Sequence, residues 1–159
     1  MDDVYAINLA KTRIREGYEN EDVDAILSVY DDSFTDMSAS YPSFYDTDSK
    51  KVFRAKLTRL FSEYLAQLTT IIITVSVFGD RALDRGWNVL TLTSKTTART
   101  LEVRTRYFEV WRRDSVRGWV ITSFIDNLDQ SPMLPDDLIA QIQNSTTSSI
   151  VTRSQGDHS

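Results

Sequence analysis

Residues 101–126, LEVRTRYFEVWRRDSVRGWVITSFID, hold two runs rich in β-branched and aromatic residues with a short polar segment between them. Such runs are typical of strands, and the polar segment Asp114–Gly118 is typical of a hairpin turn. We therefore predict strands at Leu101–Arg113 and Trp119–Asp126 that pair as an antiparallel hairpin.

Two further strands are predicted upstream of this hairpin. Ile71–Phe78 is β-branched and apolar, Gly79 and Asp80 predict a turn, and Ala82–Thr93 continues the strand pattern. The second half of the chain is therefore expected to form a meander of four antiparallel strands.

The first half of the chain has apolar residues at three- and four-residue steps, the period of an α-helix. These steps predict a first helix that closes near Gly17, a second helix capped by Asn20 or Asp22, and a third that begins at Asp48 or Ser49. A short strand, Phe34–Met37, and a loop over 38–47 separate the second helix from the third. Helices followed by a strand meander predict an α+β fold with an antiparallel sheet.

Length and composition limit the classes of function. The 159 residues fit one domain, which we expect to span 1–143, and the Ser/Thr-rich segment 144–159 is expected to be disordered. The net charge of −5 argues against a nucleic-acid partner. The chain has no Cys and a single His, His158, which argues against thiolate chemistry, Ser-His catalysis and His- or Cys-bound metals. No targeting signal or membrane-spanning run is recognisable, so a cytoplasmic protein is expected.

Strand alternation predicts which side chains face the helices. On this inner face we expect a large aromatic surface with a few polar groups, the composition of a ligand pocket. The same aromatic residues could simply pack the core. The predicted inner-face residues are Trp87, Val89, Tyr107, Glu109, Trp111, Trp119, Ile121, Ser123 and Asn127.

The opposite face of the sheet is also expected to be too apolar to remain in water. It combines several arginines with Leu90, Leu92, Phe108, Val110 and Phe124. This composition predicts a homodimer through the outer sheet face.

Three residues are candidates for catalysis, each with a plainer alternative. Glu109 is a carboxyl group on an apolar inward face, so it is either functional, paired with an arginine, or turned outward by a bulge. Asp36 is either a general base beside the pocket or a loop carboxylate. Tyr107 is either a hydrogen-bond donor to a substrate oxygen or a buried tyrosine whose hydroxyl is satisfied by a neighbour.

The order of elements and three local motifs resemble a known group of proteins. The motifs are Asp22–Met37, Gly79–Trp87, and Tyr107–Asp114 followed by Gly118–Ile121 and Asp126-Asn127. Over residues 4–128 the chain resembles the SnoaL-like polyketide cyclases, ketosteroid isomerases and nuclear-transport-factor-2-like proteins. The resemblance implies a cone-shaped, cystatin-like fold in which three N-terminal helices pack on a curved antiparallel sheet around an apolar pocket.

The resemblance also implies a type of chemistry. In ketosteroid isomerases a Tyr on the first helix and a protonated Asp on a later strand hold an oxyanion, while an Asp at the end of the first strand moves the proton. These isomerases are a standard example of carboxyl groups whose pKa values are set by their environment. Alignment on Asp22 places Ile14 at the Tyr position, Met37 or Asp36 at the base position, and the later Asp near Tyr107.

The predicted site therefore combines Asp36, Tyr107 and Glu109 as catalytic residues with a wider lining. We add Ile14, Tyr18, Met37 and the loop residue Tyr41 to the inner-face residues named above. The predicted function is cofactor-free, carboxylate-driven proton transfer on a small apolar molecule, without a metal. The alternative is a non-catalytic domain that binds a small molecule or mediates dimerisation or protein association.

Overall fold

The computed structural model describes residues 2–39 and 48–129. In this part the chain forms three helices and five strands. They are α1 (Asp3–Glu19), α2 (Val23–Leu27), β1 (Tyr30–Met37), α3 (Asp48–Glu63), β2 (Tyr64–Phe78), β3 (Arg81–Ser94), β4 (Thr100–Asp114) and β5 (Gly118–Leu128). The predicted α+β class is confirmed, whereas the predicted tail 144–159 and Tyr41 lie outside the described residues.

The five strands form one sheet in the order β1-β5-β4-β3-β2. Strands β2 to β5 are the expected antiparallel meander, but β1 pairs with β5 in parallel. The sheet is therefore mixed, and the prediction of a purely antiparallel sheet is wrong. The reason is that β1 joins a strand about 90 residues later, which no local pattern predicts.

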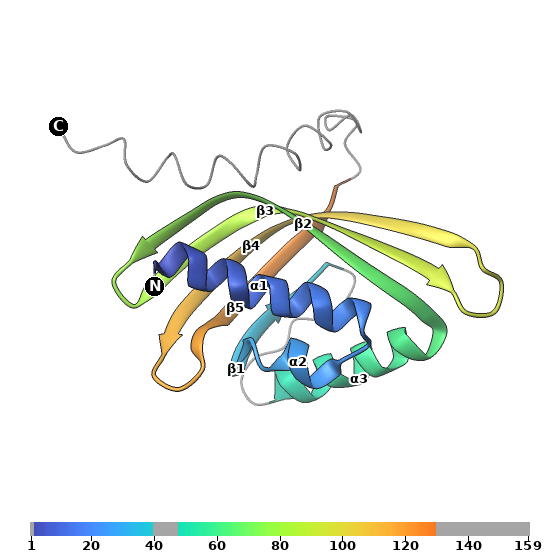
Figure 1. Cartoon of the computed structure of the whole chain (residues 1–159), viewed down its shortest axis with the longest axis horizontal. Helices are drawn as coiled ribbons and strands as arrows, with labels where there is room; N and C mark the ends of the chain where they lie inside the picture. The colour runs from blue at the N-terminus through green and yellow to red at the C-terminus, as the bar shows by residue number, and fades with distance from the viewer. Residues whose placement is uncertain (1, 40–47, 130–159) are drawn as a thin grey trace. The chain divides into compact units, whose positions relative to one another are not determined.

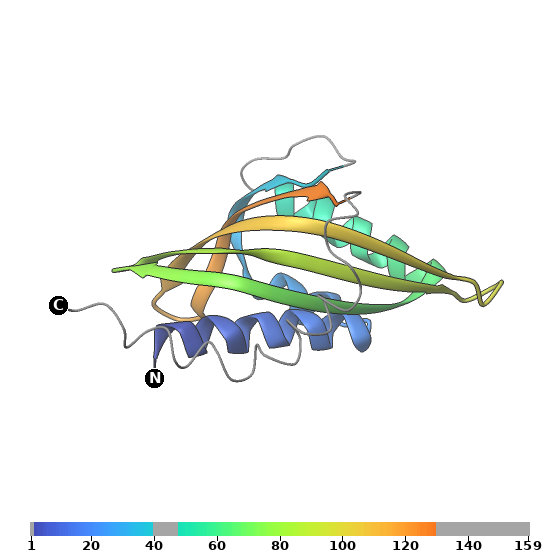
Figure 2. The ribbon, with the colours of Figure 1, turned by 90° about the horizontal axis from the view of Figure 1, so that it is seen from above.

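The sheet is strongly curved, and its helices lie on one face (Figure 1). Helix α1 packs mainly against β2, while α3 packs against β1, so the two long helices lie near opposite edges of the sheet (Figure 2). In α1 the side chains that face the sheet recur at helical spacing, as Ile7, Lys11 and Ile14. A helix near each edge of a curved sheet leaves space over its centre.

Two element boundaries differ from the sequence prediction. Helix α2 ends at Leu27 and β1 begins at Tyr30, four residues before the predicted strand start at Phe34. Helix α3 runs directly into β2 at Tyr64, seven residues before the predicted strand start. Short apolar runs fit both the helical period and the strand period, which explains both errors.

A bulge in β5 reverses side-chain alternation in the middle of the strand. Trp111 pairs with Ile121, whereas its neighbour Val110 pairs with Ser123, so β5 holds one extra residue at this point. Trp119 and Ile121 face the helices as predicted and are buried, but beyond the bulge the even-numbered residues Phe124 and Asp126 face inward. The predicted inward orientation of Ser123 and Asn127 is therefore wrong.

The register between β3 and β4 also corrects the predicted faces. Gly86 pairs with the inward Tyr107, so Trp87 pairs with the outward Arg106. Consequently Trp87 and Val89 lie on the outer face of the sheet, and Leu90 and Leu92 on the inner face. The alternation within β3 was recognised correctly, but its face depends on pairing with β4, and a shift of one residue exchanges the two faces.

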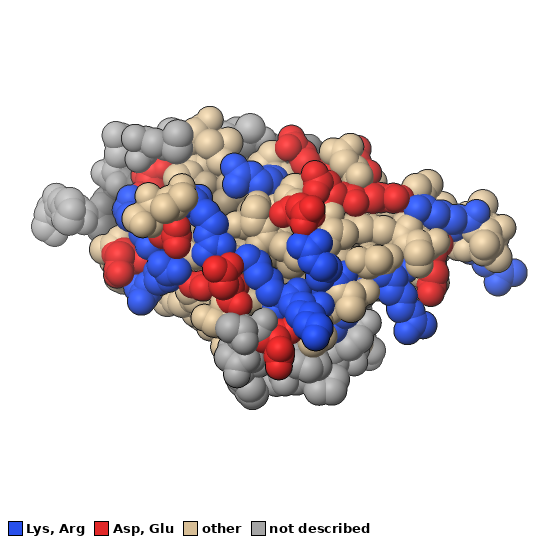
Figure 3. Space-filling view, turned by 90° about the horizontal axis from the view of Figure 1, so that it is seen from below, with Lys and Arg blue, Asp and Glu red and all other residues tan. Residues whose placement is uncertain are grey.

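The helical side of the molecule carries charges of both signs. Figure 3, which views the molecule from this side, shows basic and acidic side chains next to one another over much of the face. Two of the ion pairs join α3 to neighbouring elements, Arg54 to Asp24 at 2.6 Å and Lys50 to Asp32 at 2.9 Å. Among the described residues, no helix is long and apolar enough to span a membrane.

Candidate functional site

A cavity of about 390 Å³ lies between α1, α3 and the concave face of the sheet. This volume is in the range of small-molecule sites. Most of its wall is aliphatic or aromatic. The residues that line it are Lys11, Ile14, Tyr18, Tyr30, Phe34, Asp36, Ser38, Ala39, Phe53, Lys56, Leu57, Leu60, Leu68, Thr70, Asn88, Leu90, Leu92, Val103, Thr105, Glu109, Phe124, Asp126 and Leu128.

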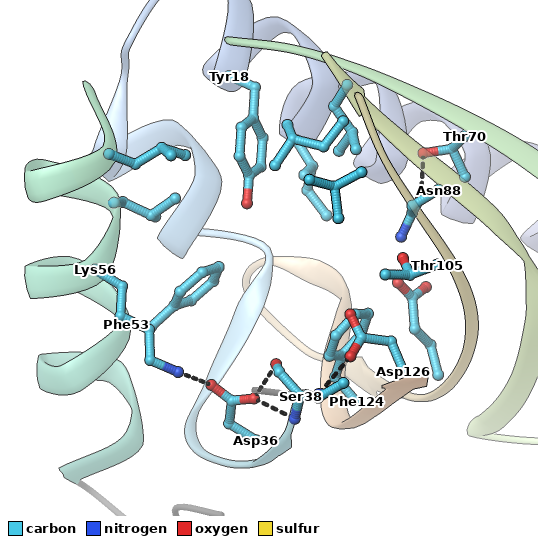
Figure 4. A pocket seen from close by; sticks show the side chains of 18 of the residues that line it. Tyr18, Asp36, Ser38, Phe53, Lys56, Thr70, Asn88, Thr105, Phe124 and Asp126 are labelled. Carbon is cyan, nitrogen blue, oxygen red and sulfur yellow. Dashed lines mark hydrogen bonds and ion pairs between the residues drawn. The ribbon is translucent and has the colours of Figure 1, made fainter. Parts of the chain in front are cut away.

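The first polar group on the wall is the Asp36 cluster, which we define as Asp36, Ser38, Lys56 and Asp126. Asp36 is only 4% exposed, and its carboxylate accepts hydrogen bonds from the Ser38 amide at 3.0 Å and from the Ser38 hydroxyl. The Lys56 ammonium lies 3.3 Å from the other carboxylate oxygen. Figure 4 shows these contacts at the end of β1, where Asp36 faces the cavity. The carboxylate is thus held in place from both sides.

Asp126 is the second carboxyl group of this cluster. Its side chain accepts a hydrogen bond from the Ala39 amide at 2.6 Å. Burial raises the pKa of Asp126, and the nearby carboxylate of Asp36 raises it further. The raised pKa favours the protonated form of Asp126 more than an exposed aspartate would, although the hydrogen bond from Ala39 acts in the opposite direction.

Tyr18 approaches the same region from α1. Its hydroxyl points into the cavity toward the Asp36 cluster (Figure 4). Burial raises the pKa of Tyr18, and the nearby carboxyl groups of Asp126 and Asp36 add to the effect, so the phenol keeps its proton. Among the described residues no hydrogen-bond partner of this hydroxyl is found, which leaves its proton available to a ligand.

The second polar group is the Lys11 cluster, which consists of Lys11, Asp84, Tyr107 and Glu109. The Lys11 ammonium lies 2.6 Å from a carboxylate oxygen of Asp84 and 2.6 Å from one of Glu109. Lys11 and Glu109 are each 3% exposed and Asp84 is fully buried. Asp84 and Glu109 are direct partners across β3 and β4, and Lys11 reaches them from α1.

Burial by itself shifts the pKa values of the basic and the acidic members of this cluster in opposite directions. Burial alone would lower the pKa of Lys11, but the two carboxylates outweigh it and raise that pKa. Burial raises the pKa of Glu109 to about 8, since the negative charge of Asp84 adds to burial while Lys11 opposes it. Near neutral pH Glu109 therefore keeps its proton.

Tyr107 contacts the other members of this cluster and does not line the cavity. Its hydroxyl donates a hydrogen bond to Asp84 at 2.9 Å, and its ring lies 4.3 Å from the Lys11 ammonium. Burial raises the pKa of Tyr107, and the charges of Asp84 and Glu109 raise it further. Tyr107 does not line the cavity, so its position matches the satisfied, buried alternative considered from the sequence.

A smaller polar patch lies on the sheet opposite α3. The hydroxyl of Thr70 donates to the side-chain oxygen of Asn88 at 2.9 Å, and Thr105 lies beside Asn88 on the next strand. These three residues line the cavity (Figure 4). They offer uncharged hydrogen-bonding groups only.

The structure brings some of the predicted site residues to the cavity and places others elsewhere. Asp36, Glu109, Ile14 and Tyr18 line the cavity. Trp111, Trp119 and Ile121 are buried in the core beside it, and Met37 is exposed. Trp87, Val89, Ser123 and Asn127 lie on the outer face, for the reasons of register and bulge given above.

Sequence reasoning missed four charged residues of the site. They are Lys11, Lys56, Asp84 and Asp126. Lys11 carried a signal, because it lies on the apolar face of the first helix, where an ammonium group requires a buried partner. Alternation predicts that Asn127 faces inward, and the bulge in β5 brings its neighbour Asp126 to the inner face instead.

Comparison with known proteins identifies the fold. The structure matches a candidate dehydratase of the NTF2-like family from Streptomyces avermitilis with a TM-score of 0.71 and 16% identity, over 81% of this chain and 97% of that one. It matches a ketosteroid isomerase-like protein from Erwinia carotovora with a TM-score of 0.67 and 17% identity, over 82% and 98%. The chain has the NTF2-like fold. The resemblance seen in the sequence is thus confirmed for the fold.

Proteins that match this structure differ in the function that their names suggest. A third match, a candidate calcium/calmodulin-dependent protein kinase II association domain from Xanthomonas campestris, has a TM-score of 0.63 and 16% identity, over 79% of this chain and 86% of that one. No protein-family model matches the sequence, and no curated protein matches it. At these identities the comparisons show the fold alone, and the function has to be argued from the cavity.

Proposed function

We propose that this NTF2-like protein binds a small apolar molecule with a carbonyl group and catalyses proton transfer next to that carbonyl without a cofactor. The observation that carries the proposal is the wall of one cavity, where the Asp36 carboxyl group lies with a second carboxyl group, Asp126, and the hydroxyl of Tyr18. A base and hydrogen-bond donors at one apolar site are the requirements of enolisation.

Each group has a defined role in this reaction. Asp36 takes a proton from the carbon beside the carbonyl, the C–H electron pair forms the enolate double bond, and the carbonyl oxygen gains negative charge. The Tyr18 hydroxyl and the protonated Asp126 donate hydrogen bonds to that oxygen. Asp36 then returns the proton to the same or a neighbouring carbon, so no external reactant is consumed.

The contacts of the other predicted catalytic residues favour Asp36 as the base. Glu109 is held by the Lys11 ammonium at 2.6 Å and keeps its own proton near neutral pH. The hydroxyl of Tyr107 is occupied by Asp84. Tyr18, predicted from the sequence only as a lining residue, replaces Tyr107 as the proposed donor.

Two of the structural neighbours have names that agree with this chemistry. One is described as a dehydratase and the other as ketosteroid isomerase-like. Both names denote reactions in which protons move at carbon atoms near an oxygen. These names fit the proposal, while the reaction and the assignment of residues are argued from this cavity.

The proposal is tested by proton exchange at a simple ketone. Incubation with 4-phenylcyclohexanone in D₂O, followed by mass spectrometry, should show deuterium entering beside the carbonyl faster than in buffer alone. Asp36→Asn should lower the protein-dependent rate by about 100-fold or more, because it removes the base. Asp32→Asn is the matched control on the same strand, since the Asp32 side chain is 76% exposed.

Two outcomes of this experiment would contradict the proposal. Exchange that Asp36→Asn leaves unchanged would remove Asp36 as the base. Binding of the ketone with no protein-dependent exchange would favour the second candidate function, a non-catalytic domain for binding or association.

The second candidate is favoured by a feature of the outer sheet face. Met37, Ile125 and Phe108 are paired across β1, β5 and β4, and each of them is 38–42% exposed. Such an apolar row on a sheet is typical of a protein contact. We therefore propose that two copies of the chain associate through this face, and the association-domain neighbour supports a role in assembly. The cytoplasmic location expected from the sequence stays a prediction.

A further inference from the structure

The Lys11 cluster has no part in the proton transfer proposed above, yet it lies on the wall of the same cavity. A buried ammonium with two acids is costly to desolvate, and an apolar replacement of similar volume is often at least as stable. Lys11 and Glu109 both line the cavity instead of being sealed from it. A charged group that is costly to bury and lies on the wall of a cavity suggests a contact with a ligand.

We propose that the Lys11 cluster is a second recognition point of the cavity, and that the ligand carries an uncharged oxygen group, a hydroxyl or a carbonyl, at the end opposite the reacting carbonyl. The assignment of the reacting end rests on the proposed function. The existence of the second recognition point rests on the geometry of the Lys11 cluster alone.

Glu109 is the member of the cluster that meets the ligand. Asp84 does not line the cavity and is fully occupied, because it accepts from Lys11 at 2.6 Å and from the Tyr107 hydroxyl at 2.9 Å. Glu109 lines the cavity, accepts from Lys11 through one of its oxygens, and also lies within hydrogen-bond reach of Asp84. Asp84, Tyr107 and Lys11 thus position the Glu109 carboxyl group at the cavity wall.

The charge balance of the cluster indicates the class of ligand group. Asp84 compensates the charge of Lys11, and burial holds the pKa of Glu109 at about 8, so the cluster is neutral overall near neutral pH. A charged ligand group would therefore be buried without a counter-ion, which is costly. An uncharged oxygen group can share a hydrogen bond with the Glu109 carboxyl group at far lower cost.

The spacing of the two clusters indicates the length of the ligand. Lys11 and Tyr18 are seven residues apart on α1, which corresponds to about 10 Å along a helix. Across the sheet, Glu109 pairs with Phe124 and Phe124 pairs with Asp36, so two strand spacings separate the acids, again about 10 Å. Ile14 lies between the clusters on the helix, as Phe124 does on the sheet. The cavity thus fits an elongated apolar body with one oxygen at each end.

Two ketones that differ by one hydroxyl group test this inference by binding alone. The probes are 4-phenylcyclohexanone and 4-(4-hydroxyphenyl)cyclohexanone, whose hydroxyl lies at the far end from the carbonyl. Calorimetry should show that the wild-type protein binds the hydroxylated probe roughly tenfold more tightly, the effect of one hydrogen bond. Without a polar partner the buried hydroxyl would weaken binding, so the sign of the difference is informative.

Variants identify the group responsible for this preference. Glu109→Leu leaves the neutral pair of Lys11 and Asp84 and should abolish the preference for the hydroxylated probe. Glu109→Gln keeps a donor at the same place and should retain it. Glu102→Leu is the matched control, because Glu102 lies on the same strand but is exposed and pairs with Arg104 outside the cavity, and it should also retain the preference.

The result that overturns the inference is plain. It fails if the wild-type protein binds the two probes equally, prefers the probe without the hydroxyl, binds neither, or if Glu109→Leu keeps the preference. The proposed function is tested separately, because the Asp36→Asn protein should lose deuterium exchange and keep the preference for the hydroxylated probe. Exchange without preference overturns only the inference, and preference without exchange overturns only the function.

Discussion

Glu109 lies beside the Lys11 ammonium on the wall of the cavity, and only part of this environment could be predicted from the sequence. Strand alternation alone places Glu109 on the inner face, which the structure bears out. Its partner, however, is Lys11, 98 residues away, and not one of the nearby arginines considered from the sequence. The need for a partner follows from local chemistry, whereas its identity depends on which helix lies over β4.

Removal of the ammonium tests whether the Lys11 cluster depends on its charge balance. Lys11→Met should lower the free energy of unfolding by about 3–5 kcal/mol, because it removes the cation of the buried ion pair with Asp84. The control is Lys50→Met at the exposed pair with Asp32, which should cost no more than ~1 kcal/mol. Urea unfolding of both variants measures the difference, and equal costs would contradict a charge-dependent core.

The pH dependence of stability tests the raised pKa of Glu109. In the unfolded chain this acid loses its proton near its ordinary pKa of 4.5, whereas in the folded protein it keeps the proton up to about 8. Between these values the folded state binds more protons, so this group makes the protein less stable as the pH rises, by at most ~1.4 kcal/mol per pH unit.

Glu109→Gln should remove this slope, since the amide does not titrate. The stability of the variant relative to the wild-type protein should therefore increase from pH 5 to pH 8 and then level off. Urea unfolding at several pH values measures it. A difference between the two proteins that does not change with pH would show that Glu109 titrates normally.

At the scale of elements, pairing register determines which residues reach the cavity. The types and the approximate extents of the strands β3, β4 and β5 follow from local composition. Their faces do not, because the extra residue in β5 exchanges inside and outside beyond Ile121. Because of this exchange, alternation predicts Asn127 on the inner face, whereas Asp126 lies there. A bulge depends on the fit between two strands, and neither strand shows it alone.

Gly86 in β3 offers a test of the register that builds the Lys11 cluster. A Cβ atom at this position would lie 2.0 Å from the carbonyl oxygen of Ile71 and 3.0 Å from the hydroxyl of Tyr107. Gly86→Ala should therefore destabilise the protein at the upper end of the ~1–3 kcal/mol typical of overpacking, or more.

Gly79 is the matched control in the turn between β2 and β3. It has a φ of 62° and open space around it, so Gly79→Ala should cost only about 1 kcal/mol of backbone strain. Thermal unfolding compares the two variants. A Gly86→Ala protein as stable as the control would mean that β2 and the Tyr107 ring do not approach Gly86 as described.

At the scale of the whole molecule, the α+β class and the NTF2-like fold are accessible from the sequence, because the order of helices and strands is distinctive. The parallel pairing of β1 with β5 is not, since it joins distant segments. The same limit applies to the site, where Asp36 and Tyr18 meet Asp126 only after β1 docks beside β5.

The proposed association through the outer face belongs to this scale. Sedimentation at micromolar concentration should show a dimer, whose interface we expect to bury ~800 Å² per partner. Ile125→Glu places a charge in the centre of the row between Met37 and Phe108 and should yield monomers. A wild-type protein that sediments as a monomer at these concentrations would contradict the association.

A crystal structure of the protein with 4-(4-hydroxyphenyl)cyclohexanone tests the whole account most directly. We predict that the ligand occupies the cavity between α1, α3 and the sheet, with its carbonyl oxygen within hydrogen-bond distance of Tyr18 and Asp126 and its hydroxyl at Glu109. The carbon beside the carbonyl should face the Asp36 carboxylate. A ligand bound outside this cavity, or bound inside with no polar contact to Asp36, Tyr18 or Asp126, would contradict it.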